Sequence, residues 1–309
     1  METAAVPRPD GTDGPRAGPA RTIDTALLDR LKSRQARADD GERTPIDVIA
    51  PATGHVVATV PESTDADIAD ASRRARAAQP AWASRSFRGR ARVFLRLHDL
   101  LLARQAEVMD LIQLETGKAR KDAFEEVADA AICCRYYAHT AGHHLRSRRR
   151  RGTLPLLTRV WEHHHPVGLV GFITPWNYPL SMALSDVAPA LMAGNAVLLK
   201  PDHQTPFTTL WAARLADEAG LPPGLLQVVN GDGARIGAPV IDAVDHIAFT
   251  GSTATGRIVA RRAADRLIGC SLELGGKNAL VVLDDADVPA AADAAVRGTF
   301  SNAGQLCVS

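Results

Sequence analysis

The 309-residue sequence predicts an α/β fold in which a parallel β-sheet is covered by helices on both faces. From residue 167 onward, short continuous apolar runs alternate with segments of helical periodicity, as expected for strands that are buried on both sides. The residues before this point are mostly amphipathic, so we expect a helical N-terminal layer. After residue 275 a further apolar run and a further helical run indicate the start of a second α/β domain.

The helical layer is predicted from apolar residues that recur at helical spacing. Gly117 follows one of these periodic segments and suits the left-handed position just beyond a helix end. The expected elements are helices over residues 25–37, 65–79, 90–114 and 123–145, with short strands over residues 46–49 and 55–60.

The sheet is predicted from the alternating second half of the chain. Such a Rossmann-like parallel sheet binds ligands outside the carboxyl ends of its strands. Asn177, Lys200, Gly251 and Glu273 fall at or just beyond these ends, so we expect a site there. The expected strands are residues 167–173, 196–200, 225–229, 245–249 and 267–274, with helices over residues 180–193, 207–219, 235–243 and 252–264. The second domain is expected to begin with a strand over residues 278–283 and a helix over residues 289–300.

Composition excludes several classes of protein. The formal net charge is +1, which gives no overall attraction to nucleic acid or to a membrane surface. The four cysteines are too few for a disulfide scaffold in a chain of this length, so we expect a reducing, cytoplasmic location. No stretch approaches 18 consecutive apolar residues. Residues 1–21 are rich in Pro, Gly and Ala and are predicted to form a disordered tail.

Two polar runs lie between the helical layer and the sheet. Residues 146–152 contain five arginines and could form a nucleic-acid patch, but the near-neutral net charge favours a solvated connector. Residues 163–165 are three consecutive histidines in a β-like segment expected over residues 158–165. Because neighbouring side chains on a strand point to opposite faces, they cannot all bind one ion, and we predict no metal site.

Three residues have side chains suited to acyl chemistry. Cys307 lies in a glycine-containing turn after a helical segment, where a thiolate could act as a nucleophile. Glu273 ends a strand beside two glycines, which leave room for a general base to move. Asn177 lies in a loop held by two prolines, where a side-chain amide could stabilise an oxyanion. Taken singly, each has a structural alternative: a buried thiol, a paired strand-end carboxylate and an Asx-turn.

A second group of residues suggests phosphate or ribose binding. Gly251 and Gly256 lie between a strand and a helix, and the free N–H groups of the helix could bind a phosphate. A plain turn capped by Ser252 is the structural alternative. Lys200 follows an apolar strand and could donate to ribose hydroxyls or a phosphate, or extend its ammonium to solvent from a strand end.

The sequence from about residue 43 to residue 309 resembles the aldehyde dehydrogenase superfamily, and it looks most like the bacterial NADP-type succinate-semialdehyde dehydrogenases. The matching sequence motifs are highly specific as a set. These motifs are Pro175-Trp-Asn-Tyr-Pro179, Ala193-Gly-Asn-Ala-Val197, Leu199-Lys-Pro201, Phe249-Thr-Gly-Ser252, Glu273-Leu-Gly-Gly276 and Asn302-Ala-Gly-Gln305 followed by Cys307.

The resemblance implies oxidation of an aldehyde to a carboxylic acid. It implies that Cys307 attacks the aldehyde, that Asn177 and the Cys307 N–H hold the oxyanion, and that Glu273 activates water to hydrolyse the thioester. It implies that Lys200 contacts the adenosine ribose region and Ser252 the pyrophosphate. The full set of implied cofactor-binding residues is Ile173, Thr174, Pro175, Trp176, Lys200, His203, Gly251, Ser252, Gly256, Leu274 and Gly275.

The resemblance also implies a domain organisation. Residues 22–145 and 167–275 would form the cofactor-binding domain, residues 146–166 a connector and an oligomerisation strand, and residues 276–309 the beginning of a catalytic domain. Related catalytic domains continue well beyond the nucleophile, so we expect a truncated chain that is inactive by itself, and a homo-oligomer for a full-length form. The alternative is an inactive remnant that at most binds a nucleotide.

Two departures from the resembled pattern affect specificity. NAD-preferring relatives carry Glu three residues after the lysine, where this sequence has His203. Without that carboxylate to repel a 2′-phosphate, we expect NADP to be preferred, with NAD as the alternative. The arginines that hold a substrate carboxylate in succinate-semialdehyde enzymes correspond to Ser185 and Ser301. The resemblance therefore favours succinate semialdehyde, whereas these two positions weaken that prediction.

Overall fold

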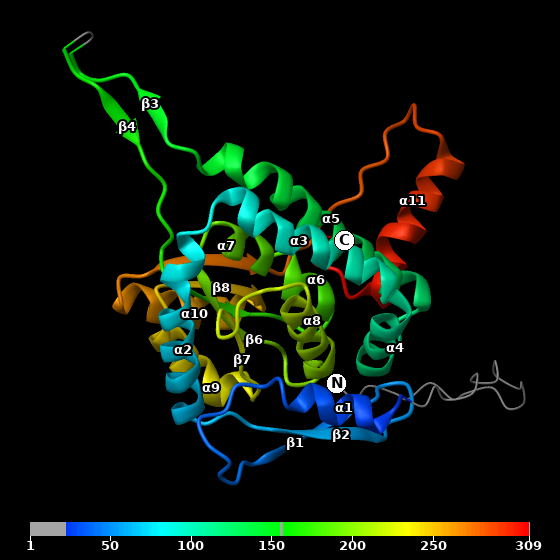
Figure 1. Ribbon diagram of the computed structural model, residues 1–309. Coiled ribbons are helices and arrows are strands. Elements are labelled where there is room, and N and C mark those ends of the chain that lie inside the picture. Colours follow the sequence, from blue (N-terminus) through cyan, green and yellow to red (C-terminus); the bar gives the residue numbers. More distant parts are fainter. Residues whose placement is uncertain (1–22, 155–156, 309) are drawn as a thin grey trace, which may run out of the picture.

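The computed structural model describes residues 23–154 and 157–308. The disordered tail predicted for residues 1–21 lies outside the described part of the chain. Figure 1 shows a central sheet between layers of helices, with a long ribbon and a C-terminal helix that project from the body. The predicted α/β fold with a parallel sheet is confirmed.

Five parallel strands form the central sheet in the order β7-β6-β5-β8-β9. From β5 the chain moves outward on one side to β6 and β7, and then crosses to the other side of β5 for β8 and β9. Every residue of β5 and β6 is buried, because helices cover both faces at this position. The strands are β5 (Leu169–Ile173), β6 (Ala196–Lys200), β7 (Leu226–Val228), β8 (His246–Gly251) and β9 (Gly269–Leu274).

Two groups of helices form the layers on the sheet. In the first group, α2 and α10 both pack against α9. In the second group, α3 to α8 pack against one another, and α1 packs on α8. The first group is α2 (Asp65–Ala83), α9 (Gly233–Ala243) and α10 (Thr253–Asp265), and the second is α1 (Thr25–Lys32), α3 (Phe87–Ala103), α4 (Gln105–Thr116), α5 (Arg120–Leu145), α6 (Pro179–Leu184), α7 (Val187–Met192) and α8 (Pro206–Glu218).

Three helices predicted as continuous are shorter or broken. The helix expected over residues 90–114 divides at Arg104, whose φ of −110° and ψ of 20° let α3 and α4 each pack on α5 and α8. The helix expected over residues 180–193 divides at residues 185–186. The helix expected over residues 25–37 ends at Lys32, because the Ala36 N–H then bonds to the carbonyl of Val228 in β7. The left-handed Gly117 that ends α4 is confirmed, with φ of 72°.

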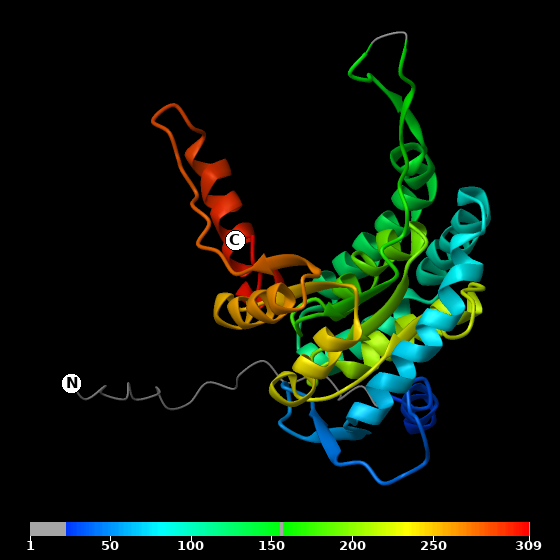
Figure 2. The same ribbon diagram turned by 90° about the vertical axis from the view of Figure 1, so that its left-hand side faces the viewer.

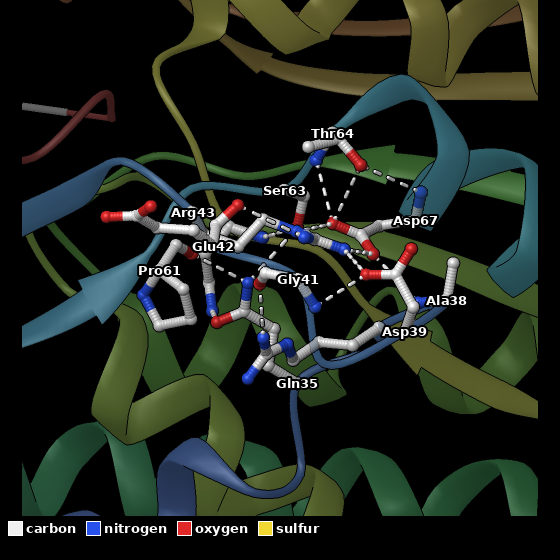
Figure 3. Close-up of polar contacts among 12 residues, drawn as sticks. Gln35, Ala38, Asp39, Gly41, Glu42, Arg43, Pro61, Ser63, Thr64 and Asp67 are labelled. Atoms are coloured by element: carbon white, nitrogen blue, oxygen red, sulfur yellow. Dashed lines mark hydrogen bonds and ion pairs between the residues drawn. The ribbon is translucent and has the colours of Figure 1, made fainter.

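A polar network joins α2 to residues 38–43, which lead into the β1–β2 hairpin (Pro45–Ile49 and Val56–Pro61). Figure 3 shows Arg43 between two carboxylates, and it donates to Asp39 at 2.8 Å and to both oxygens of Asp67 at 2.8 Å. Burial alone would raise the pKa of Asp67, but hydrogen bonds from Arg43 and from the N–H groups of Thr64 and Ala38 hold it well below its usual range. Thr64 also caps α2 in a reciprocal capping box with Asp67.

An antiparallel ribbon projects from the body of the molecule (Figure 1). It consists of β3 (Arg148–Arg150) and β4 (Val160–Glu162), so the strand expected over residues 158–165 is only three residues long. Arg150 pairs with Glu162 across the ribbon. The arginine run is therefore partly a strand and not only a connector.

The segment after β9 differs from the prediction. Residues 278–283 form no strand, because no neighbouring strand within the described residues offers hydrogen-bond partners. The helix expected over residues 289–300 is present as α11 (Val288–Phe300), and none of its residues is buried. Figure 2 shows this segment leaning away from the sheet. A short 3₁₀ turn, Ser301–Gly304, leads to Cys307.

Candidate active site

The carboxyl edge of the sheet carries most of the residues that were predicted to bind a cofactor. β5 ends at Ile173, β6 at Lys200, β8 at Gly251 and β9 at Leu274. The chain leaves β5 toward β6 on one side, whereas β8 lies on the other side, so this edge contains a topological switch point. Crevices outside such switch points are the usual ligand sites of open parallel sheets.

Lys200 places a buried ammonium group at this edge. Lys200 is only 3% exposed. Burial lowers the pKa of its ammonium group, whereas the charges of Asp202 and Asp232 act to raise that pKa. A Cβ atom added at Gly233, the first residue of α9, would lie 3.7 Å from the Lys200 Nζ. The ammonium therefore lies beside the N-terminus of α9, which could bind ribose or phosphate oxygens. His203 lies nearby, with Nδ1 3.6 Å from the Asp202 carboxylate.

The turn from β8 to α10 brings the chain close to β9. Ser252 caps α10, and its Oγ accepts a hydrogen bond of 3.2 Å from the Thr255 N–H. A Cβ atom at Gly256 would lie only 2.5 Å from Cδ2 of Leu274, so a side chain there would have to move the Leu274 side chain. Ser252 thus has the capping role that was the structural alternative for this turn, and the exposed N-terminus of α10 remains beside it.

The loop after β5 joins the cofactor edge to the oxyanion candidate. The Thr174 N–H donates to the carbonyl of Lys200 at 3.1 Å, which fixes the start of the loop to β6. The Thr174 hydroxyl is buried and has no hydrogen-bond partner within the described residues. Pro175 and Trp176 follow and are both partly buried.

Asn177 contacts the loop that contains Cys307. Its Nδ2 donates to the carbonyl of Gln305 at 2.9 Å. Asn302 is 2% exposed, and its Nδ2 donates to the carbonyl of Asn177 at 3.1 Å and to that of Gln305 at 2.8 Å. These bonds join two segments that are about 130 residues apart in the sequence. An amide nitrogen carries two N–H groups, so Asn177 retains one donor after its bond to Gln305.

Cys307 itself is exposed. Its carbonyl accepts a hydrogen bond of 2.9 Å from Asn278, which ties the end of the described chain to the loop after β9. Burial raises the pKa of Tyr178 to about 12, and the charges of Glu126 and, more weakly, of Cys307 contribute, so Cys307 also lies near Tyr178.

Glu273 is on β9, the exposed edge strand of the sheet. Its backbone pairs with Thr250 of β8, and within the described residues its side chain forms no hydrogen bond or ion pair. Its charge acts on Asp186, whose pKa is raised by burial first and by Glu273 and Asp129 in addition. Leu274 packs against the core, and Gly275 has open space where a side chain would lie. Glu273 therefore lies close enough to Asp186 for their charges to interact, and within the described residues no hydrogen bond joins its side chain to Asn177 or Cys307.

The two serines that replace the expected arginines are both engaged in local bonds. The Ser185 hydroxyl donates to the Asp129 carboxylate at 2.8 Å. The Ser301 hydroxyl donates to the carbonyl of Arg297 within the last turn of α11. Neither serine extends a charged group toward the loop of Cys307.

Lys118 and Glu126 belong to the site but were not predicted from the sequence. Lys118 Nζ donates to the carbonyl of Asn177 at 2.6 Å and pairs with Glu126 at 2.5 Å. The sequence offered one indication of Lys118. Lysine is scarce in this chain, and Lys118 directly follows the Glu115-Thr-Gly motif at the end of α4.

Two kinds of feature are absent from the part of the chain that the structure describes. No three His, Cys, Asp or Glu side chains converge in a way that could hold a metal ion. None of the described helices combines the length and the apolar content that crossing a bilayer requires.

Comparisons with known proteins give one consistent result. Residues 37–309 match the sequence family described as "Aldehyde dehydrogenase family". A protein of Mycolicibacterium smegmatis, named as a candidate NADP(+) succinate-semialdehyde dehydrogenase, is 46% identical over 290 residues, which are 94% of this chain and 54% of the relative. The chain thus spans about half the length of the curated relatives it matches.

Solved structures agree with this result. The crystal structure of succinate-semialdehyde dehydrogenase from Burkholderia pseudomallei is 36% identical, with a TM-score of 0.82, and the match covers 86% of this chain and 55% of that one. A structure of PnpE in complex with nicotinamide adenine dinucleotide is 34% identical, with a TM-score of 0.82, and the match again covers 86% of this chain and 55% of that one.

Proposed function

The chain belongs to the aldehyde dehydrogenase family, and we propose that it serves the oxidation of an aldehyde to a carboxylic acid with a nicotinamide cofactor. The observation that supports this most strongly is the bond of 2.9 Å from the Asn177 side chain to the carbonyl of Gln305, two residues before Cys307. This bond supports the proposal because it joins the loop that carries the amide donor to the loop that carries the thiol.

The residues at the carboxyl edge fit a nicotinamide dinucleotide. The buried Thr174 hydroxyl lacks a partner among the described residues, and the Lys200 ammonium lies beside the N-terminus of α9. Both are polar groups that a ribose or a phosphate could satisfy. The proposed cofactor-binding residues are Ile173, Thr174, Pro175, Trp176, Lys200, His203, Gly251, Ser252, Gly256, Leu274 and Gly275.

Cys307 is the proposed nucleophile. Its thiolate attacks the carbonyl carbon of the aldehyde, so that a C–S bond forms and the carbonyl oxygen becomes an oxyanion. The remaining N–H of Asn177 and the backbone N–H of Cys307 stabilise that charge. The chemistry that a bound nicotinamide would supply is acceptance of the hydride from the thiohemiacetal carbon, which would leave a thioester on Cys307. Glu273 then removes a proton from water, whose oxygen attacks the thioester and releases the acid and the thiolate.

NADP is the proposed cofactor. His203 stands at the third position after Lys200, where a carboxylate would repel the 2′-phosphate, and the Lys200 ammonium can pair with that phosphate. We expect the dissociation constant for NADP(+), measured by calorimetric titration, to be smaller than that for NAD(+). Tighter binding of NAD(+) would show that this proposal is wrong.

Succinate semialdehyde is the proposed substrate because the relatives bear that name. Ser185 argues against it, because its hydroxyl is engaged by the Asp129 carboxylate and supplies no positive charge. A comparison of kcat/KM for succinate semialdehyde and for butanal decides the matter. Equal values would show that no carboxylate pocket exists.

A second candidate function is nucleotide binding without turnover by the 309-residue chain. The exposure of Cys307 favours it, together with that of Val281 at 75% and Phe300 at 70%. Water in an open site weakens the electrostatic stabilisation on which the proposed chemistry depends. We therefore expect slow or undetectable steady-state turnover by this chain alone.

Two further proposals concern the setting of the protein. The β3–β4 ribbon is proposed to pair subunits in a homo-oligomer, since it projects from the body and exposes Trp161 at 55%. A cytoplasmic location is proposed because all four cysteines are free and the Cys307 thiol must stay reduced to react.

The test of the proposed function is aldehyde-dependent formation of reduced nicotinamide, followed by absorbance, together with a nucleotide titration. Reduction that is lost in Cys307→Ala supports aldehyde oxidation. Nucleotide binding without reduction selects the second candidate. A chain that neither binds NADP(+) or NAD(+) nor reduces them contradicts both.

A further inference from the structure

We propose that Lys118 and Glu126 are positioning residues that hold Asn177 in the geometry needed to stabilise an oxyanion. This rests on the proposed function, because the Asn177 amide has that task only if Cys307 adds to an aldehyde. Both act on the backbone that follows the Asn177 side chain, Lys118 at the Asn177 carbonyl and Glu126 at the first turn of α6.

Lys118 holds the peptide that follows Asn177. Its Nζ donates to the Asn177 carbonyl at 2.6 Å and lies 4.4 Å from the centroid of the Tyr178 ring. The side chain is 3% exposed, so water does not compete for these contacts. Asn302 donates to the same carbonyl, and this peptide oxygen therefore accepts two side-chain hydrogen bonds.

Glu126 holds the residues that come next. Its Oε2 accepts from the N–H of Leu180 at 2.9 Å and from that of Ser181 at 3.3 Å, both in the first turn of α6. The residue that precedes α6, Tyr178, provides no side-chain cap, so a carboxylate from α5 supplies it. Its Oε1 accepts from Lys118 at 2.5 Å, and the side chain is fully buried.

Burial of the Lys118–Glu126 ion pair costs free energy, so a role other than stability is needed to explain it. Burial lowers the pKa of Lys118 and raises that of Glu126, so each charge is maintained against its loss of solvent. Packed apolar side chains often stabilise a fold as well as a buried ion pair does. What apolar side chains cannot do is donate to the Asn177 carbonyl and cap α6 at once. A donor that is displaced by about 1 Å loses much of its catalytic value.

The test uses the 309-residue chain and does not require turnover. Alkylation of Cys307 by iodoacetamide, quantified by peptide mass spectrometry, reports thiol reactivity. The butanal concentration that half-protects Cys307 from alkylation reports aldehyde addition, which alone needs the oxyanion donor. The variants are Lys118→Met, Asn177→Ala and their combination. Lys121→Met is the matched control, because that lysine lies three residues further along the chain, in the first turn of α5, with a side chain that is 74% exposed.

We expect Lys118→Met and Asn177→Ala each to raise the half-protecting concentration about tenfold, because each disables the same donor. Their combination should be no worse than Asn177→Ala alone, and alkylation without butanal should stay within about twofold. Lys121→Met should behave as the unchanged chain. An additive loss in the combination, or no loss in Lys118→Met, overturns the positioning role. No loss in Asn177→Ala instead overturns the proposed function.

If Lys118→Met does not fold, as the loss of a cooperative unfolding transition would show, a second variant tests the proposal. Glu126→Gln keeps an acceptor for the α6 N–H groups but weakens the bond that orients Lys118. We expect a smaller rise in the half-protecting concentration, about threefold, with thiol alkylation unchanged. An unchanged half-protecting concentration in Glu126→Gln would contradict the proposal.

Discussion

The centre of the sheet and the segment after β9 have similar apolar patterns but opposite surroundings. All residues of β5 and β6 are buried, because neighbouring strands and two helix layers surround them. Residues 280–283 are equally apolar, yet they are between 51% and 75% exposed and form no strand. An apolar run therefore indicates which residues can be buried, whereas a strand forms only where a neighbour accepts its backbone hydrogen bonds.

The two regions meet at the candidate active site. Asn177 belongs to the packed body, where Lys118 and Glu126 hold its backbone. Cys307 belongs to the exposed segment and is tied to the body through Gln305 and Asn302. The oxyanion donor is thus on a rigid support, and the nucleophile is on a more open one.

Truncation of one apolar side chain in each region should give the largest contrast. Leu198 in β6 is 0% exposed, so we expect Leu198→Ala to lower the free energy of unfolding by about 2–5 kcal/mol. Val281 is 75% exposed, so Val281→Ala should change it by less than about 0.5 kcal/mol. Urea unfolding measures both. Similar losses in the two variants would show that the segment after β9 is packed in solution.

The buried body should also show a pH dependence that can be assigned to Glu115. Burial raises the pKa of Glu115 from 4.5 to about 7, against hydrogen bonds from Thr208 and Phe207. The folded chain then binds this proton more tightly than the unfolded chain does. The stability that this proton on Glu115 contributes to the folded chain is complete below pH 4.5 and is lost as the pH rises to about 7.

Glu115→Gln imitates the protonated carboxyl group and removes this titration. Relative to the variant, the unchanged chain should lose ~3 kcal/mol of unfolding free energy between pH 4.5 and pH 7. Urea unfolding of both proteins across this range provides the difference. A difference that stays constant with pH, or that grows in favour of the unchanged chain, would contradict the assignment.

The smallest expected contrast compares two helix caps. Thr64 caps α2 in the packed body, and Asp287 caps α11 in the exposed segment. We expect Thr64→Ala to reduce the free energy of unfolding by about 1 kcal/mol. Asp287→Ala should leave the global value unchanged, because α11 buries no residue and contributes little to it. Equal effects on the thermal midpoint would indicate that α11 unfolds together with the body.

Most of the sheet could be predicted from the sequence because its signals are local. Residues 196–200 were predicted as a strand and are β6 with the same bounds. The breaks at Arg104 and at residues 185–186 were not predicted, because helical periodicity continues across them and only packing against neighbouring helices requires the bend. The strand expected over residues 278–283 was wrong because its pairing depends on partners that periodicity does not reveal.

The site was predictable where a strand end or a motif identified it, and not where a distant side chain supports it. Asn177, Lys200 and Gly251 lie at the edge where the strand pattern places them. Lys118 acts on Asn177 from 59 residues away through a backbone carbonyl. A bond to a main-chain oxygen imposes no residue type at the other end, so nothing in the sequence near Asn177 indicates its partner.

The most direct measurement is carbon-13 NMR of the chain mixed with butanal labelled at the carbonyl carbon. This tests whether the contact between Asn177 and the loop of Cys307 forms a site of aldehyde addition, independently of turnover. We expect a protein-bound thiohemiacetal resonance that is absent in Cys307→Ala and strongly reduced in Asn177→Ala. A resonance of equal intensity in Cys307→Ala, or no bound resonance in the unchanged chain, would contradict the assignment of Cys307 and Asn177.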